Sequence, residues 1–385
     1  MSTVFCVVLC GWATGHGPAP RSGQVNEGNE MLYCRVAVMG VVFILLSLNG
    51  WVSQAAEGFP SIKVTNHRRL PHDGQHSAFT DMTWFKGEIY LVYRTCPDGH
   101  MVHPTSRIVI LRSSDGKQWK QVHSFNVSKR DVRDPHLQVF RERLFVYTGT
   151  WYCGDSSPAK WDMNQHLGYA VSSMDGKTWS KPRLLEGTYG HYIWRTASHD
   201  GKIYMCGRRK RNFAEVSTRA QLDQVVRSMI LVSDDGFRFT PIGSFQDEYG
   251  DETALLFEEN GDMFAVSRRR GGRTAQVVRL KAPYTVSSRV DLDRYVGGPL
   301  LKKWEGNYIV GGRNLQKKTP YVSLCWLKDD RLTEFAALPS GGDCSYPGFI
   351  QLCPGCALVS YYSSHEKDAD GRPMTAIYLV ELERE

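Results

Sequence analysis

The sequence predicts an all-β fold, a β-propeller of six four-stranded blades, and two repeated patterns support this prediction. A hairpin pattern occurs six times, at spacings of about 45 to 60 residues, which suits one blade per hairpin. A turn built from Ser, Asp and Gly occurs three times. Few segments have a helical period, and we expect one short helix at residues 218–227.

Each hairpin has two apolar runs of β-forming residues joined by a tight turn. The six hairpins lie at residues 84–94, 140–149, 199–208, 259–268, 304–313 and 346–362. Because each blade contains one such hairpin, six blades fill the chain from about residue 60 to residue 385. We expect the segment 64–70 to help close the ring.

The repeated turn occurs at residues 113–119, 173–179 and 233–239, and its aspartates are 60 residues apart each time. The Asp-Gly pair makes the turn, the Ser and Asp side chains bond its backbone, and the aromatic residue that follows enters the core. We therefore expect a structural role for this turn, at the end of the blades away from any ligand.

The N-terminal region predicts export. Residues 1–30 have no clear periodicity and suggest an extension or a misassigned start. Residues 31–55 combine a basic start, an apolar run and a small-residue site, which describes a secretory signal cleaved after Ala55. The apolar run, residues 36–48, is too short for a comfortable membrane span. Residues 56–385 would then be a single secreted or periplasmic domain without a membrane span.

The formal net charge of +7 is modest and dispersed, which does not favour nucleic acid as a partner. We interpret the basic cluster at residues 208–211 as solvated loop ends, and the cluster at residues 268–270 as part of a site for an anionic small molecule.

Seven cysteines follow the signal segment, and this odd number argues against a complete disulfide framework. Cys353 and Cys356 flank a Pro-Gly turn and predict a structural turn or a local disulfide. The pair lacks a second Cys pair for a metal and a following helix for redox chemistry. We therefore expect no metal and no cofactor.

Propeller geometry predicts where a ligand would bind. The innermost strand of each blade starts at the axial ligand face and the next strand returns to it, so residues at those two places converge. Those places hold residues 77–81 with Arg94; Arg133 and Asp134 with Tyr147; Trp194 and Arg195 with Arg208 and Arg209; Asp251 and Glu252 with Arg268 and Arg269; Gly297 and Gly298 with Arg313; and Tyr346 with Tyr362, Ser364 and His365.

A ring of arginines suits an anionic substrate, because the guanidinium fork bonds a carboxylate through two parallel hydrogen bonds and stays charged. The arginines expected to bind substrate are Arg94, Arg133, Arg195, Arg268, Arg269 and Arg313. We also expect that at least one arginine of the ring only pairs with Asp134, Asp251 or Glu252.

Several segments of the chain resemble the sialidase (neuraminidase) superfamily. Residues 252–268 resemble the segment in which a Glu opens one strand and an Arg ends the next. Residues 78–81, 338–348 and 360–366 are similar to bacterial secreted sialidase-like propellers. The Ser-Asp-Gly turns resemble the Asp-box of that superfamily, although each is one residue shorter. The resemblance covers roughly residues 75 to 382.

The resemblance implies a glycosidase that removes a terminal sialic acid or a related acidic sugar from a glycoconjugate. Tyr346 would be the nucleophile and Glu252 the base that takes its phenolic proton. Arg268 or Arg269, together with Arg313, would clamp the substrate carboxylate. A neutral tyrosine suits attack beside that carboxylate, and its ordinary pKa near 10 requires a neighbouring base.

The sequence departs from the family in two places. The first triad arginine is absent, since residues 76–79 replace the motif that carries it, and Arg94 or Arg195 could take its place. The family's acid/base Asp is also missing, because Ser106 and Arg107 occupy that position. The residues that could supply the proton instead are Asp81, Asp134, His100 and His103.

Two other functions remain open from the sequence. Residues 133–135, Arg-Asp-Pro, resemble a motif of five-bladed furanosidase-type glycosidases. In a mechanism that uses only carboxylates, Asp81 would be nucleophile or base, Asp134 would tune it, and Glu252 would be the acid. The third possibility is a non-catalytic propeller that binds acidic glycans.

Overall fold

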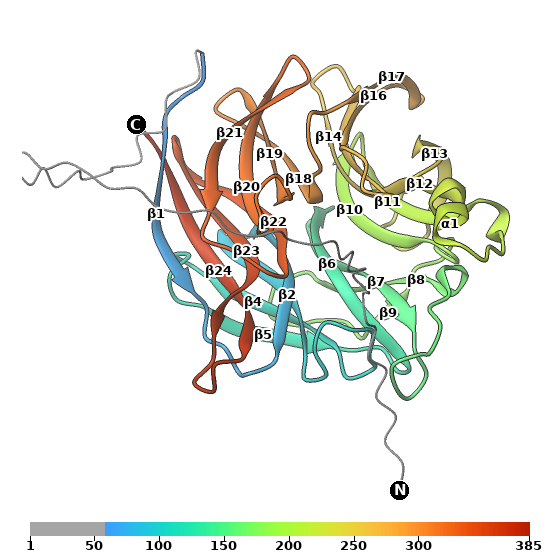
Figure 1. The fold of residues 1–385 in the computed structure, drawn as a ribbon, viewed down its shortest axis with the longest axis horizontal. Helices are drawn as coiled ribbons and strands as arrows, with labels where there is room; N and C mark the ends of the chain where they lie inside the picture. The colour runs from blue at the N-terminus through green and yellow to red at the C-terminus, as the bar shows by residue number, and fades with distance from the viewer. Residues whose placement is uncertain (1–57) are drawn as a thin grey trace, which may run out of the picture. The chain divides into compact units, whose positions relative to one another are not determined.

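The computed structural model describes residues 58–385, which form six four-stranded antiparallel sheets around a central axis (Figure 1). The predicted six-bladed β-propeller is confirmed. The proposed signal segment and its cleavage site lie outside the described residues. Between residues 58 and 385, no helix is long and apolar enough to cross a membrane.

The blades follow one another along the chain. Blade 1 contains β2 (His76–Phe85), β3 (Glu88–Cys96), β4 (Arg107–Ser113) and β5 (Lys120–Phe125). Blade 2 contains β6 (Arg130–Phe140), β7 (Arg143–Tyr152), β8 (Leu167–Ser173) and β9 (Arg183–Leu184). Blade 3 contains β10 (Tyr192–His199), β11 (Lys202–Lys210), β12 (Val226–Ser233) and β13 (Thr240–Gln246).

Blades 4 to 6 repeat the pattern and close the ring. Blade 4 contains β14 (Gly250–Phe257), β15 (Met263–Arg269), β16 (Gln276–Lys281) and β17 (Thr285–Asp291). Blade 5 contains β18 (Gly297–Trp304), β19 (Asn307–Asn314), β20 (Tyr321–Lys328) and β21 (Arg331–Leu338). Blade 6 contains β22 (Cys344–Cys353), β23 (Cys356–Lys367), β24 (Pro373–Arg384) and β1 (Ile62–Arg69).

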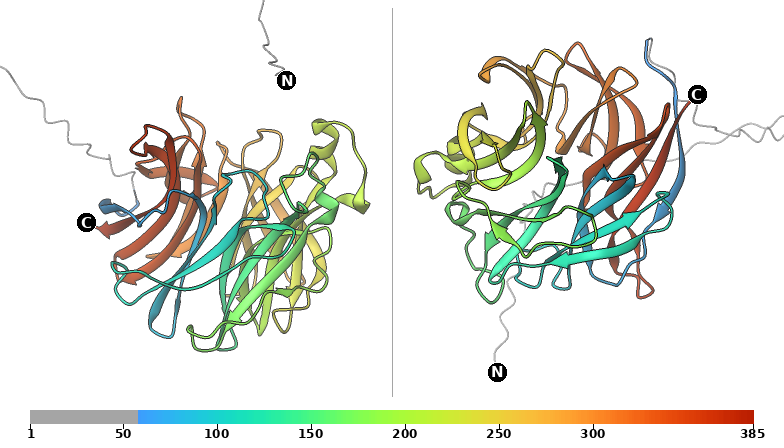
Figure 2. Two further views of the ribbon diagram at one scale, coloured as in Figure 1. Left: turned by 90° about the horizontal axis from the view of Figure 1, so that it is seen from below. Right: turned by 180° about the vertical axis from the view of Figure 1, so that it is seen from behind.

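The outer edge of blade 6 joins the two ends of the described chain. Strand β1 pairs antiparallel with β24, with Ile62 opposite Arg384 and Arg69 opposite Tyr378. Ladder hydrogen bonds therefore tie the first blade-forming strand to the last one, as the sequence predicted for this segment. The expected helix is also present as α1 (Arg219–Val225), which begins at a capping box formed by Thr218 and Gln221. In the side view of Figure 2, α1 projects at one end of the blades.

Two-residue bulges interrupt the inner strands of all six blades at the same place. Pairing with the second strand skips residues 79–80, 134–135, 194–195, 251–252, 298–299 and 346–347. Phe79, Asp134 and Tyr346 take positive φ angles of 64°, 52° and 53° in these bulges. A bulge re-aims the side chains of the bulged strand, and here it turns them toward the axis.

The three Ser-Asp-Gly turns have the same internal hydrogen bonds. In the first, Ser113 Oγ accepts a hydrogen bond from the Gly116 N–H at 2.9 Å, and Asp115 Oδ1 accepts from the Lys117 and Gln118 N–H groups at 2.8 and 2.9 Å. The turns at Asp175 and Asp235 repeat these bonds. Each of the three turns joins the third and fourth strands of a blade.

The hairpin turn of blade 6 carries a disulfide between Cys353 and Cys356. Cys353 ends β22 and Cys356 begins β23, so the bond closes the hairpin at the end of the blade away from Tyr346. The pair is therefore remote from the residues that converge on the axis. Cys96, Cys153, Cys206, Cys325 and Cys344 are free and buried.

Candidate active site

A cavity of about 290 Å³ lies on the axis at the end where the inner strands begin. Two sets of side chains line it. The bulges of the inner strands contribute Phe79, Asp134, Glu252 and Tyr346. The second strands contribute Arg208, Arg268, Arg313 and Tyr362. The volume is just below the usual range for small-molecule pockets, roughly 300–1,000 Å³, and suits a small ligand.

Tyr346 and Glu252 form a direct hydrogen bond inside this cavity. The Tyr346 hydroxyl donates to Glu252 Oε1 at 2.5 Å, and both residues are buried. The other carboxylate oxygen, Oε2, accepts from Arg268 Nη1 at 2.8 Å and from the Gly298 N–H at 3.1 Å. Burial and the carboxylates of Asp134 and Glu252 raise the pKa of Tyr346 well above its ordinary value. Tyr346 is therefore a neutral phenol with a proton acceptor in place.

Gly298 makes the close approach of Tyr346 possible. A Cβ atom at position 298 would lie 2.8 Å from Cδ2 of the Tyr346 ring and 2.6 Å from Ser345 Oγ. Gly298 also has a positive φ of 60°, which side chains rarely adopt. Only glycine lets blade 5 donate its N–H to Glu252 while blade 6 packs Tyr346 against it.

Three arginines from neighbouring blades face the cavity, each near the end of a second strand. Arg208 Nη1 pairs with Asp251, and Arg268 Nη1 pairs with Glu252. Arg313 Nε donates to the Cys344 carbonyl at 2.6 Å, and its Nη2 donates to Asp343 at 3.1 Å.

Each of these arginines keeps donor capacity. Among the described residues, Arg208 Nη2, Arg268 Nη2 and Arg313 Nη1 have no hydrogen-bond partner. Nearby carboxylates outweigh burial and raise the pKa of Arg208 and Arg268, so both stay charged. Three free guanidinium N–H groups around one small cavity are suited to an anionic group.

Asp134 lines the same cavity as Glu252 and is buried. Its Oδ2 accepts a hydrogen bond from the Tyr192 hydroxyl at 2.6 Å, and its Oδ1 is buried without a partner among the described residues. Burial, followed by the charge of Glu252, raises the pKa of Asp134 to about 6. Asp134 can therefore exchange a proton near neutral pH, whereas most aspartates are ionised there.

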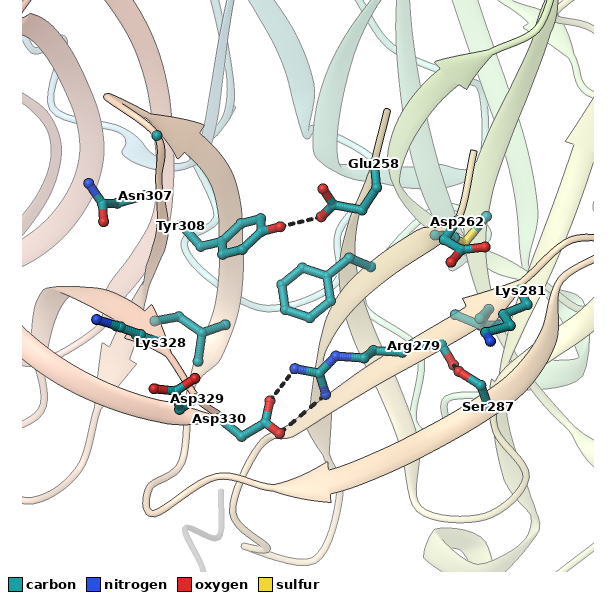
Figure 3. A pocket seen from close by; sticks show the side chains of 15 residues that line it. Glu258, Asp262, Arg279, Lys281, Ser287, Asn307, Tyr308, Lys328, Asp329 and Asp330 are labelled. Atoms are coloured by element: carbon teal, nitrogen blue, oxygen red, sulfur yellow. Dashed lines mark hydrogen bonds and ion pairs between the residues drawn. The ribbon is translucent and has the colours of Figure 1, made fainter. Parts of the chain in front are cut away.

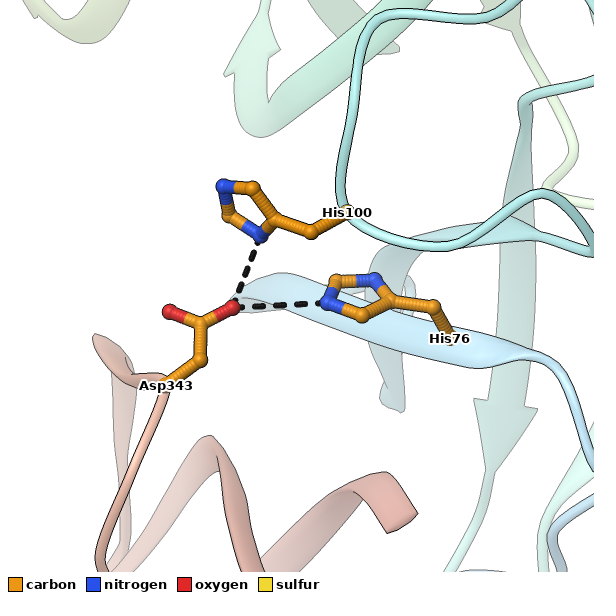
Figure 4. A group of neighbouring side chains, drawn as sticks. All are labelled: His76, His100 and Asp343. Carbon is orange, nitrogen blue, oxygen red and sulfur yellow. Dashed lines mark hydrogen bonds and ion pairs between the residues drawn. The ribbon is translucent and has the colours of Figure 1, made fainter. Parts of the chain in front are cut away.

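A second polar group lies at the cavity wall around Asp343, in the loop before β22 (Figure 4). Asp343 Oδ2 contacts His100 Nδ1 at 2.7 Å and His76 Nε2 at 3.3 Å. Its Oδ1 accepts from Arg313 Nη2 at 3.1 Å and from the Tyr362 hydroxyl at 2.9 Å. Burial would raise the pKa of Asp343, but its histidine partners and Arg313 hold it far below the ordinary value.

The trio His76, His100 and Asp343 has the residue types of a metal site, with ligand atoms within 4.8 Å of one another. The sequence did not indicate this group, because its members are far apart in the chain. A hydrogen bond from His76 and the close contact of His100 with the same carboxylate oxygen already explain their closeness. The Arg313 guanidinium on the same carboxylate disfavours a second cation there, so we assign no metal to it.

The structure places Arg94 outside the cavity, contrary to the expectation that it binds substrate. Its side chain is fully buried. Nε and Nη2 bond the two oxygens of Asp131 at 3.1 Å each, and Nη1 and Nη2 bond the carbonyls of Gly99 and Met101. Arg94 therefore anchors loop 97–106, which folds over it and presents His100 to the cavity.

Arg195 and Asp81 also lie outside the cavity, deeper along the axis. Arg195 donates to the carbonyls of Pro299 and Pro347 at 2.8 and 2.7 Å and to Asp81 Oδ1 at 3.1 Å. It therefore ties together bulges of blades 5 and 6. Asp81 follows the blade 1 bulge, so it points below the floor of the cavity and faces His136. Neither residue can touch a ligand in the axial cavity.

The remaining predicted residues divide between the cavity and its surroundings. Arg133 lines the cavity, but its Nη2 is held by Asp131 and by the carbonyl of His100 at 3.1 Å. Arg269 points away and bonds Asp291 at 2.6 Å and the Thr274 carbonyl at 2.8 Å. Of the predicted site residues, the cavity brings together Tyr346, Glu252, Asp134, Arg133, Arg268, Arg313 and the possible proton donor His100.

Several lining residues had no predicted substrate role. Arg208 lines the cavity beside Arg268 and Arg313, whereas the sequence had offered Arg94 or Arg195 as the additional arginine. Tyr192, Trp151 and Trp161 form an aromatic wall on the side of blades 2 and 3. Trp161 is 48% exposed, so this wall reaches the surface. The pairing of Tyr192 with Arg208 could have indicated Tyr192 as a lining residue. No local signal marks Trp161, which lies in a long loop.

A larger cavity of about 520 Å³ lies between blades 4 and 5, near the hairpin turns (Figure 3). Three of its charged side chains, Arg279, Asp330 and Glu258, already have partners. Arg279 bonds both oxygens of Asp330 at 2.6 and 3.2 Å, and the Tyr308 hydroxyl donates to Glu258 at 2.5 Å. The axial cavity, by contrast, has free N–H groups and a poised hydroxyl, so it is the better candidate despite its smaller volume.

No family model matches the chain, and no curated protein matches it either. Solved structures do. A protein of unknown function from Dyadobacter fermentans superposes with a TM-score of 0.69 at 19% identity, covering 85% of this chain and 100% of that one. The Trypanosoma rangeli sialidase bound to 2,3-difluorosialic acid gives 0.58 at 11% identity, covering 84% of this chain and 59% of that one.

An α-L-arabinofuranosidase from Fusarium graminearum gives a TM-score of 0.56 at 11% identity, covering 82% of this chain and 97% of that chain. At such identities the likeness shows the fold alone, a propeller shared with glycosidases of different specificity. This chain spans 59% of the length of the trypanosomal sialidase chain.

Proposed function

We propose that the protein is a secreted glycosidase of sialidase type, which removes a terminal sialic acid or a related acidic sugar from a glycoconjugate. One observation carries this proposal. A buried tyrosine hydroxyl donates to a buried glutamate in a cavity where three arginines have free N–H groups. These are a nucleophile, its base and an anion-binding ring in one site of monosaccharide size.

The chemistry follows from the charges. A sugar carboxylate bound by Arg208, Arg268 and Arg313 would repel an anionic nucleophile beside the anomeric carbon. Tyr346 is neutral until it attacks, and Glu252 takes its proton as the new bond forms. The glycosyl-tyrosine intermediate is then hydrolysed by water, which makes this a two-step retaining reaction.

The test is a comparison of Tyr346→Phe with Tyr189→Phe on an umbelliferyl α-sialoside. Tyr189 is 58% exposed and lies outside the axial cavity, so its variant controls for loss of a hydroxyl. We expect Tyr346→Phe to lower kcat by about 1,000-fold or more, as removal of a nucleophile does, and Tyr189→Phe to leave it unchanged. Full activity of Tyr346→Phe would overturn the mechanism.

A carboxylate mechanism is the second candidate, and the raised pKa of Asp134 favours it. Asp134 and Glu252 share one cavity in different environments, as the acid and base of a glycosidase do. If this mechanism operates, Asp134→Asn should abolish release of a neutral furanoside while Tyr346→Phe retains it. Tight binding of acidic sugars without turnover would instead indicate a glycan-binding propeller.

A further inference from the structure

The proposed reaction needs a proton donor for the departing glycosidic oxygen, and His100 is placed to supply it. His100 lies in loop 97–106 between β3 and β4, and its side chain lines the axial cavity while remaining 46% exposed. The sugar that leaves points out of the cavity, so the donor must stand at the mouth. Asp134 and Glu252 are only 4% exposed and lie beside Tyr346 on the floor.

The backbone around His100 is fixed by two buried arginines. Arg94 bonds the carbonyls of Gly99 and Met101, on either side of His100, at 3.1 and 3.0 Å. Arg133 Nη2 donates to the carbonyl of His100 itself at 3.1 Å. Both arginines are held by Asp131, which is fully buried. The loop position of His100 is therefore set by a charged network beneath it.

The imidazole ring is oriented by Asp343. Its Nδ1 lies 2.7 Å from Asp343 Oδ2, while Nε2 points away from this carboxylate (Figure 4). Asp343 is itself held by Arg313 and Tyr362, both of which line the cavity. A carboxylate this close to Nδ1 favours a proton there and leaves Nε2 to carry the second proton.

We propose that His100 is the catalytic acid of this site and that Asp343 is its positioning residue. This inference rests on the proposed glycosidase function. In the first step Tyr346 Oη bonds the anomeric carbon and its proton passes to Glu252. The glycosidic C–O bond breaks, its electron pair goes to the leaving oxygen, and that oxygen takes the proton from His100 Nε2.

The second step restores each group. Neutral His100 takes a proton from water as the water oxygen bonds the anomeric carbon. The bond from that carbon to Tyr346 Oη breaks, and the phenolate recovers its proton from Glu252. The groups that face His100 are Asp343 in the loop before β22, His76 on β2, Phe79 in the blade 1 bulge and Arg133 on β6.

The experiment compares substrates with different leaving groups, because a good leaving group departs without taking a proton from the enzyme. His100→Gln is compared with His103→Gln, a histidine of the same loop that bonds Thr105 and Asp98 and does not line the cavity. Each is assayed on sialyllactose and on the umbelliferyl sialoside. We expect His100→Gln to lower kcat/KM on sialyllactose by about 100- to 10,000-fold, and on the umbelliferyl substrate by less than about tenfold.

The other outcomes separate the two proposals. If the wild-type protein cleaves neither substrate, the proposed glycosidase function itself is wrong. If His100→Gln loses equal activity on both substrates, His100 binds or supports the site and the proton-donor role is wrong. If Asp134→Asn shows the leaving-group dependence instead, the acid is Asp134. Asp343→Asn should show the same dependence as His100→Gln in weaker form, whereas a purely structural role would lower both rates together.

Discussion

Replacement of Arg94 by Met tests the structural role assigned to this buried arginine. Methionine keeps an unbranched apolar stem but removes one of the two cations next to Asp131. Burial raises the pKa of Asp131, and Arg133 and Arg94 together lower it below the ordinary value. Loss of one partner of a buried ion pair costs about 3–5 kcal/mol, because the other charge stays buried with less compensation.

Equilibrium unfolding in urea at pH 7 measures this loss of stability directly. We expect Arg94→Met to reduce the free energy of unfolding by about 3–5 kcal/mol. Arg107→Met is the matched control, since Arg107 is exposed at the start of β4, and we expect a change within about 0.5 kcal/mol. An unchanged unfolding free energy together with a raised KM would refute this reasoning, since it would make Arg94 a substrate ligand.

Two further predictions concern the cavity. Burial and Glu252 raise the pKa of Asp134 to about 6. Between about pH 4 and pH 6 this carboxyl is therefore ionised in the unfolded chain but protonated in the folded protein, so the free energy of unfolding falls as the pH rises. Asp134→Asn should therefore raise the free energy of unfolding by about 2–3 kcal/mol at pH 7 and by little near pH 3.5, and equal effects at both would contradict the shift. Arg208→Lys keeps the charge beside Asp251 but loses the guanidinium fork, so KM for an acidic sugar should rise about 10- to 100-fold, with Arg209→Lys as the silent control. Equal KM values for the two variants would remove Arg208 from the substrate site.

The hairpin register made most of the arginine ring in the cavity predictable from the sequence. The residue seven positions after the turn glycine reaches the cavity from the second strand of the blade. This register pairs Gly201 with Arg208, Gly261 with Arg268, Gly306 with Arg313 and Gly355 with Tyr362, and all four later residues line the cavity. Arg94 follows Gly87 in the same register, but loop 97–106 folds over Arg94. No pattern in the local sequence indicates that a loop covers this residue.

The inner-strand bulges decided which carboxylates reach the cavity. Pro135, Pro299 and Pro347 interrupt inner strands, and proline within a central strand is tolerated at bulges, so this signal could have located Asp134 and Tyr346 in advance. The blade 1 bulge contains Phe79 and Thr80, and Asp81 follows it, so Asp81 lies below the floor. The contact between His100 and Asp343 joins loops of blades 1 and 6, and their spacing in the chain gives no sign of it.

The central claim is that Tyr346 forms a covalent bond to the sugar, and mass spectrometry of the trapped protein tests it most directly. The protein is incubated with 2,3-difluorosialic acid, digested and mapped. We expect one added glycosyl group on the peptide that contains Tyr346, and none on that peptide in Tyr346→Phe. An adduct on Glu252 or Asp134, or continued sialoside turnover without any adduct, would contradict the account.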